Sequence, residues 1–477
     1  MNSAQIRFLA VACFVLFASL SVRAQDQPPQ PAYRTALPNL QSDDTGPTDL
    51  NGQELAPDTR SLAGVQTVTL GVPALERSYW QPSFNVNAEG DSNPLSSPGV
   101  HSWSSPSEWT TILGGLNLEN VRGRSNFEMD YFGGGIVSND PAIEGGIIQE
   151  AQVSERFSGR RTEVALLDQT MYIPETSFGY GGLSELSLPA GAQLGIQSSL
   201  VPNETILSAR GQRLISASLV EVDTLLSPNA TFSMAGGYAL LHYFNDDDFN
   251  FNNVIGQAGV SLQVSRHDTV AIIYRFDQYR FPFQDYTLLG HTGELEYARR
   301  VTGRMAFEID AGAEWAIFRL PGQPASSTTW PNRVYWIGDA SFSYELNRTL
   351  LSLSYDHGIS GGSGVLTGAL TDTVSAGVAS QLTRTFHGDL KIGFGRNSQL
   401  SVVSISTGAT NPSFNYLFGT VGITHPLGRD MTWSLGYSAQ YQQASQLYCI
   451  TGVCGTSILR QQISLGFNLH PRPFAIE

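Results

Sequence analysis

The most constraining feature of this sequence is a strict alternation of apolar and polar residues that begins near Tyr79 and continues almost to the end. Between Phe307 and Trp315, for example, apolar side chains occupy every second position and acidic residues or glycine fill the positions between. Successive side chains of a strand point to opposite faces of the sheet, so each segment is apolar on one face only. The segments run to roughly 10–14 residues, whereas strands of soluble proteins are usually about 5–6 residues long.

The connections between these segments alternate between short and long. Eight short polar turns are recognisable: Asn120–Asn126, Phe157–Arg161, Leu226–Ala230, Ser265–Asp268, Val301–Arg304, Leu346–Thr349, Thr385–Asp389 and Pro426–Asp430. Longer stretches rich in Gly, Ser, Asn and Pro lie between them. Short turns at one end and long loops at the other are typical of barrels that span an outer membrane.

The turns also give a strand count. One strand on each side of the eight turns makes sixteen, and Tyr79–Glu89 and Arg460–His470 bring the number to eighteen. We therefore predict an all-β fold, a transmembrane antiparallel up-and-down β-barrel of about 18 strands, with 16 as the alternative. A closed barrel pairs every backbone group, as a membrane requires, and an even count returns both ends of the chain to the same side.

The first residues predict export. A short segment ending at the basic Arg7 precedes the apolar run Phe8–Leu20, and small residues follow up to Ala24. This is the pattern of a cleaved signal peptide, predicted here as residues 1–24. An uncleaved anchor helix is the alternative, but the run falls short of the ~20 residues that span a bilayer. Residues 25–77 are polar and aperiodic and predict a disordered periplasmic arm, which leaves residues 78–477 for the barrel.

Composition excludes some partners. The chain has 42 acidic and 27 basic residues, a net charge of −15, which argues against binding to nucleic acid. Cys13 leaves with the signal peptide, and Cys449 and Cys454 predict a small disulfide-closed loop in an oxidising compartment. Two cysteines are too few for structural zinc, and no phosphate-binding or dinucleotide motif is present in the sequence. We predict no metal and no cofactor.

The functional surface of such a barrel is its lumen. On the register of the alternation, twelve charged residues face inward: Glu221, Asp223, Arg275, Asp277, Glu294, Glu296, Glu308, Asp310, Glu314, Asp339, Glu345 and Lys391. Two interpretations stay open. These acids and bases could fill and stiffen the interior through cross-strand pairs. Alternatively, the excess of carboxylates could favour the passage of cations.

Several motifs resemble those of porin-type outer-membrane barrels of Gram-negative bacteria. The last strand, Ser464–Leu469, is similar to the signal that the barrel-assembly machinery recognises, although the closing Phe474 is out of register. The longest connection, Pro174–Gln212, begins with Pro174, Glu175, Phe178 and Gly182, which resemble the motif of the porin loop that folds inward and constricts the channel. Gly361–Ala369 resembles a stretch in porin-like barrels of unassigned substrate, some of them associated with exopolysaccharide systems.

The resemblance implies an integral outer-membrane protein in contact with lipid and lipopolysaccharide. Its predicted function is passive or mildly cation-selective diffusion of small hydrophilic solutes, with exopolysaccharide export or surface attachment as the alternative and an outer-membrane hydrolase as the third. A homo-oligomer is left open. Gly358–Gly362 fits the G-x-S-x-G pattern of hydrolases around Ser360, with Asp356 and His357 before it. That motif needs a strand-to-helix elbow, and no helix is predicted there, so we do not expect an enzyme.

Overall fold

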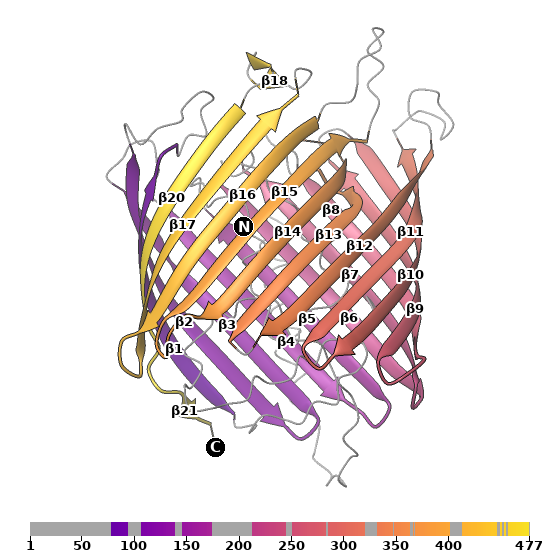
Figure 1. Ribbon diagram of the computed structural model, residues 1–477, viewed down its shortest axis with the longest axis horizontal. Coiled ribbons are helices and arrows are strands. Elements are labelled where there is room, and N and C mark those ends of the chain that lie inside the picture. The colour runs from indigo at the N-terminus through magenta and orange to yellow at the C-terminus, as the bar shows by residue number, and fades with distance from the viewer. Residues whose placement is uncertain are drawn as a thin grey trace, which may run out of the picture.

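The fold is seen in a computed structural model of the chain (Figure 1). It describes residues 78–93, 106–138, 146–173, 212–244, 250–282, 285–319, 332–346, 348–362, 366, 368–400, 413–445, 449–450, 453–454 and 457–476. The predicted signal peptide and arm lie outside these residues. No helix in the described part of the chain is long and apolar enough to cross a membrane.

One antiparallel sheet of nineteen strands closes on itself, and β21 is a two-residue addition to it, so the barrel wall has eighteen strands. This confirms the predicted fold and the higher strand count. The wall consists of β1 (Tyr79–Asp91), β2 (Ser107–Arg122), β3 (Ser125–Ser138), β4 (Ile147–Ser158), β5 (Thr162–Ile173), β6 (Arg213–Ser227), β7 (Ala230–Tyr243), β8 (Phe251–Gln263), β9 (Asp268–Phe281), β10 (Tyr286–Thr302), β11 (Met305–Arg319), β12 (Arg333–Leu346), β13 (Thr349–Ser360), β14 (Ala369–Gln381), β15 (His387–Gln399), β16 (Ser413–Pro426), β17 (Met431–Ala444) and β20 (Ser457–Leu469).

The short predicted turns gather at one end of the barrel, the lower end in Figure 1. Glycine makes two of them: Gly123 between β2 and β3 has a φ of 61°, and Gly428 between β16 and β17 has a φ of 87°. These are left-handed conformations that side-chain-bearing residues rarely adopt. Such short turns mark the periplasmic end of an outer-membrane barrel, and the opposite end is then extracellular.

The barrel closes where the first strand meets the last. β1 pairs with β2 over its whole length, but it pairs with β20 only from Phe84 to Asp91. The chain breaks away after Leu469 and returns as β21 (Phe474–Ala475) to pair with Tyr79 and Trp80. Phe474 stacks on Trp80 with ring centroids 4.5 Å apart. Phe474, which is out of register with the last strand in the sequence, therefore pairs with the periplasmic end of β1.

The outer and inner faces of the wall differ in polarity. Large apolar side chains such as Ile272 (64% exposed), Leu295 (61%) and Ile392 (53%) cover the outside. Aromatic pairs lie near both ends of this belt: Phe386 and His425 at the periplasmic end, and Trp336 and His357 at the extracellular end. An apolar belt between aromatic girdles is the surface that a bilayer requires of a barrel.

Candidate functional site: the barrel lumen

The charged residues predicted for the lumen all occupy the inward-facing positions of their strands. Along each strand they alternate in step with the buried residues, whereas the exposed apolar residues occupy the positions between them. They are distributed as Glu221 and Asp223 on β6, Arg275 and Asp277 on β9, Glu294 and Glu296 on β10, Glu308, Asp310 and Glu314 on β11, Asp339 and Glu345 on β12, and Lys391 on β15. Ten of these twelve residues are acidic, so the placement gives this part of the wall a strong excess of negative charge.

The centre of the acidic wall is a cluster around Arg275. The Arg275 guanidinium lies 3.2 Å from Asp277 Oδ2 through Nε and 2.8 Å from Glu294 Oε1 through Nη2. A third carboxyl group, that of Glu314, extends over Gly290, where its Oε1 takes the space that a Cβ would need. Gly290 lies opposite Asp277 in the register, so the glycine makes room for Glu314 to approach Asp277. Three carboxyl groups therefore share one arginine, so acidic groups outnumber basic groups in this cluster.

Further carboxylates lie on β10–β12 and on β5–β6. Towards the periplasm, Glu296 lies opposite Asp310, and the Asp310 carboxylate accepts a hydrogen bond of 2.9 Å from the backbone N–H of Asp339. On β6, Asp223 lies opposite Glu163 of β5. Glu163 in turn lies 3.1 Å from the Nε of Arg156. These contacts show cross-strand neighbours of both like and opposite charge on the inner wall.

Several acids of the same wall were not predicted from the sequence. They take inward-facing positions and are Glu119 on β2, Glu128 and Asp130 on β3, Glu150 on β4 and Asp356 on β13. The two-residue alternation could have identified the first four, because they alternate in step with the buried residues Thr111, Ile136 and Gln152 of their strands. Asp356 lies opposite Asp339 in the register. The acidic surface consequently runs over most of β2–β13.

The remaining part of the inner wall is nearly uncharged. On β14–β17 and β20, all of them described, the only inward-facing carboxylate is Asp389, and the other positions carry mainly hydroxyl, amide, glycine or aromatic residues. The Tyr416 hydroxyl lies 3.1 Å from the Thr373 hydroxyl. The rings of Tyr416 and Phe418 lie over Gly395 and Gly393 of the neighbouring strand. The lumen thus has one acidic side and one neutral side.

An apolar cluster narrows the extracellular end on the acidic side. Inward-facing residues of β5–β11, among them Tyr279, Phe281 and Leu288, are almost completely buried together with Leu400 at the end of β15. The chain between β13 and β14 contacts this cluster. Gly361 lies against the ring of Phe251 on β8, and Gly368 lies beside Leu288 on β10. The ends of this loop therefore fold inward. Pro174, Glu175, Phe178 and Gly182, predicted to begin a constriction loop, lie outside the described residues.

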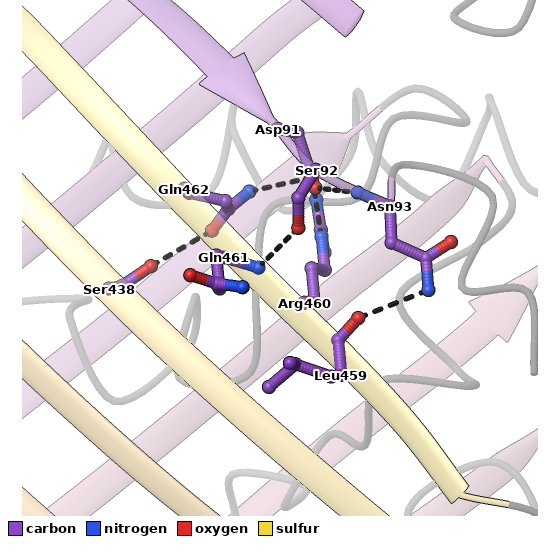
Figure 2. A network of polar contacts seen from close by, with 8 residues as sticks. All are labelled: Asp91, Ser92, Asn93, Ser438, Leu459, Arg460, Gln461 and Gln462. Atoms are coloured by element: carbon purple, nitrogen blue, oxygen red, sulfur yellow. Dashed lines mark hydrogen bonds and ion pairs between the residues drawn. The ribbon is translucent and has the colours of Figure 1, made fainter. Parts of the chain in front are cut away.

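A buried polar network fastens the closing strands near the extracellular end (Figure 2). Asp91 and Arg460 are both fully buried, and the Arg460 Nε lies 2.5 Å from Asp91 Oδ2. The Gln462 amide also donates to Asp91 Oδ2 at 3.3 Å. The backbone N–H of Asn93 donates to Asp91 Oδ1 at 2.8 Å, and the Asn93 side chain donates to the Leu459 carbonyl at 3.1 Å. The network joins β1 to β20 across the barrel seam.

The G-x-S-x-G segment does not bring Ser360 and His357 together. Ser360 ends β13 on the inner face, where its hydroxyl lies 3.0 Å from the Thr371 hydroxyl. His357 is on the outer face, stacked on Trp336 with centroids 3.6 Å apart, and its Nδ1 lies 2.6 Å from Asp372 Oδ1. The serine and the histidine are on opposite sides of the sheet, so the histidine has no access to the serine proton.

Cys449 and Cys454 lie opposite each other in the backbone register of a small hairpin. β18 (Cys449–Ile450) pairs with β19 (Val453–Cys454), and the register sets Cys449 opposite Cys454. Cα atoms of opposed antiparallel residues are about 4.5–5.5 Å apart, which lies within the span of a disulfide. The disulfide itself stays a prediction.

The closed wall, its apolar belt and its charged interior together decide the class of protein. A sheet in a bilayer pairs all of its backbone N–H and C=O groups only when it closes into a barrel without free edges. So many carboxylates are accommodated only in a hydrated lumen. The chain has the fold of an outer-membrane β-barrel. No protein-family model matches it, and no curated protein matches its sequence.

Solved outer-membrane proteins share the fold at very low sequence identity. OpdK from Pseudomonas aeruginosa is 10% identical, with a TM-score of 0.44 over 82% of this chain and 99% of that chain. OccK2 (OpdF) from the same organism is 9% identical, with a TM-score of 0.46 over 82% and 98%. A BenF-like porin from Pseudomonas fluorescens is 8% identical, with a TM-score of 0.44 over 83% and 99%. Structures exist of OpdK with vanillate and of OccK2 with glucuronate. At this level of similarity the solute of the present barrel has to be inferred from its own residues.

Proposed function

We propose that this barrel is a diffusion channel for small hydrophilic solutes and that its lumen favours cations over anions. The observation that carries the proposal is the inner wall, on which ten of the twelve charged residues discussed above are acidic. Barrels of 16–18 strands leave an aqueous channel, whereas eight-stranded barrels are filled by their own side chains. Rings of carboxylates attract cations to a pore and repel anions.

The charge cluster at Arg275 supports the preference for cations. Cross-strand pairs of opposite charge stabilise a sheet and pairs of like charge destabilise it. Glu296 nonetheless lies opposite Asp310 in the register, and Glu163 lies opposite Asp223, so like charges are neighbours on the inner wall. Opposed like charges are tolerable when mobile cations from the solution screen them, which is the state that favours cation passage.

The loop between β13 and β14 is the described candidate for a constriction. Its ends contact Phe251 and Leu288, which belong to strands on another part of the wall. The apolar cluster beneath it fills the extracellular end on the acidic side. We infer that solutes pass beside this cluster and along the inner wall. A solute that is too wide, or that would have to lose much of its hydration shell, would then be excluded. The channel would therefore admit only small molecules.

Single-channel recording in a planar bilayer tests the proposal. With a salt gradient across the membrane, the refolded mature protein is expected to give ohmic steps and a reversal potential of the sign of a cation-preferring pore. The triple variant Glu296→Gln, Glu308→Gln and Asp310→Asn should lower that potential, because three negative charges leave the wall. Lys391→Gln is the matched control, since it removes a positive charge from the same lumen and should shift the potential in the opposite direction.

The outcome is decisive in either direction. An anion-preferring pore, or equal potentials for the wild type, the triple variant and Lys391→Gln, would contradict the proposed role of the wall. Absence of steps from protein with the β-type circular dichroism and heat-dependent gel mobility of a folded barrel would contradict the channel itself.

A further inference from the structure

The short turns at the periplasmic end of the barrel are rich in arginine. Seven of the eight turns contain an arginine or directly follow one, and Leu226–Ala230 is the exception. We call these nine residues the rim arginines: Arg122, Arg124, Arg160, Arg161, Arg266, Arg304, Arg348, Arg384 and Arg429. The same turns contain three aspartates, Asp268, Asp389 and Asp430. The lower end of the barrel in Figure 1 is therefore basic, although the chain as a whole has a net charge of −15.

The rim arginines are exposed, and the barrel does not use their charges. All nine have exposed side chains. Within the described residues, no hydrogen bond or ion pair to any of their guanidinium groups is present. Asp268, for example, lies 3.6 Å from the Nε of Arg299 and accepts a hydrogen bond of 2.8 Å from Tyr297. Arginine keeps its proton in proteins, so these positive charges repel one another unless salt or an anionic partner neutralises them.

The chain itself contains a segment of the opposite charge. Residues 43–58, which we call the acidic segment, contain five acids and no base: Asp43, Asp44, Asp49, Glu54 and Asp58. Carboxylates are the partners that the planar guanidinium group binds through two parallel hydrogen bonds. The acidic segment and the rim arginines are therefore complementary in charge and in hydrogen-bonding groups.

The acidic segment is attached to the barrel at the rim. Nineteen residues, 59–77, separate it from Ser78. The Ser78 hydroxyl accepts a hydrogen bond of 3.0 Å from the N–H of Val121, which directly precedes Arg122, so the chain enters the barrel beside the first rim arginines. A flexible linker of this length has a root-mean-square span of about 25 Å, whereas adjacent turns of a tilted barrel wall are only about 13 Å apart. The segment therefore reaches turns on both sides of the seam.

We propose that the acidic segment docks on the rim arginines, with Arg122, Arg124, Arg160 and Arg161 as its first contacts. A single exposed ion pair stabilises little, but several pairs on a short tether act together at an effective concentration in the millimolar range. Lipid phosphates of the inner leaflet offer the same charge to arginine. The acidic segment is favoured because every copy of the chain holds it close to the rim. The contact is with the turns, so the inference does not depend on conduction.

Photo-crosslinking within the full mature chain tests the docking. A benzophenone amino acid replaces Leu50 in the acidic segment, and the protein is refolded in phosphatidylcholine vesicles at low salt. After illumination and digestion, mass spectrometry is expected to find residue 50 joined to peptides from the turns after β2 and β4. In 1 M salt the yield should fall at least about threefold, because the Debye length is then about 3 Å.

Three variants assign the contact to these charges. In the segment variant, all five acids are neutralised: Asp43→Asn, Asp44→Asn, Asp49→Asn, Glu54→Gln and Asp58→Asn. The rim variant carries Arg122→Gln, Arg124→Gln, Arg160→Gln and Arg161→Gln. The matched control loses four exposed arginines from the extracellular half of the wall, through Arg280→Gln, Arg319→Gln, Arg333→Gln and Arg396→Gln. The segment and rim variants should lose the crosslink at least about threefold, and the control should keep it. Heat-dependent gel mobility identifies folded protein, and the segment variant leaves the wall unchanged should the rim variant fail to fold.

The proposal is overturned if the wild type gives no crosslink to the turns, or if the crosslink persists in the segment variant or in a folded rim variant. A control variant that loses the crosslink as strongly as the rim variant also overturns it. Vesicles that contain anionic phosphatidylglycerol separate the two possible occupants. If the crosslink is kept there, the acidic segment holds the rim against lipid. If it disappears, lipid phosphate occupies the rim arginines and the proposal is overturned.

Discussion

The barrel seam allows a quantitative prediction, because one ion pair holds the upper part of β1 against β20 (Figure 2). The side chains of Asp91 and Arg460 are both 0% exposed, and their closest atoms are 2.5 Å apart. Replacing one partner of such a buried ion pair lowers the free energy of unfolding, because the remaining charge stays buried without a counter-charge. Removal of one partner typically costs about 3–5 kcal/mol.

The two single variants are expected to differ within that range. Arg460→Met leaves the Asp91 carboxylate with the Asn93 N–H and the Gln462 amide as donors, so the expected loss is near 3 kcal/mol. Asp91→Leu leaves a buried guanidinium and also strips an acceptor from the Asn93 backbone. A hydrogen bond contributes about 1 kcal/mol, so the loss should approach 5 kcal/mol. The double variant Asp91→Leu/Arg460→Met restores a neutral interior and should be more stable than Asp91→Leu.

Reversible urea unfolding in lipid vesicles, followed by tryptophan fluorescence, measures these free energies. The double-mutant cycle then gives the coupling between the two side chains, which we expect to be about 2–3 kcal/mol. Arg396→Met is the control: Arg396 is exposed on the outside of β15, and its loss should change stability by less than about 0.5 kcal/mol. Single variants that each cost less than about 1 kcal/mol, or effects that add within about 0.5 kcal/mol in the double variant, would refute the reasoning.

Three further predictions concern the loops, the arm and the cysteines. Phe251→Ala removes the ring against which Gly361 lies, so the loop after β13 should loosen and single-channel conductance should rise; an unchanged step size would mean that this loop does not limit the pore. Deletion of residues 25–77 should leave conductance unaltered, whereas loss of transport with an intact barrel would favour the export function. Alkylation of the unreduced, unfolded mature protein should label neither Cys449 nor Cys454, since we predict a disulfide between them, and labelling of either residue would disprove it.

The strands and turns could be predicted from the sequence because they depend on local patterns. Alternation over a strand such as β11 fixes which face is apolar, and a short polar turn such as the one around Gly123 fixes where the chain reverses. The same alternation already separates Ser360 from His357, because residues three apart on a strand face opposite sides of the sheet.

The seam and the apolar cluster depend on contacts that no local pattern reveals. Asp91 and Arg460 are 369 residues apart in the chain, and nothing around either residue identifies the other as its partner. The inward fold of the loop after β13 depends on Phe251, which belongs to a different part of the wall. Asp168 has the outward-facing position of β5, where an acidic residue is unusual, and the alternation alone places it there.

The uneven distribution of charge around the lumen gives a prediction that distinguishes an effect of the acids on ion preference from an effect on the shape of the pore. Carboxylates gather on β2–β13, while the inner face of β14–β17 and β20 is almost uncharged, so cations and neutral solutes are expected to follow different sides of the lumen. In liposome-swelling assays, the triple variant Glu296→Gln/Glu308→Gln/Asp310→Asn should therefore admit a neutral sugar at the wild-type rate while its cation preference falls. If sugar entry falls in parallel with cation preference, the acids maintain the shape of the wall and do not select among solutes. Such a result would favour the interpretation that the inward charges mainly stiffen the barrel.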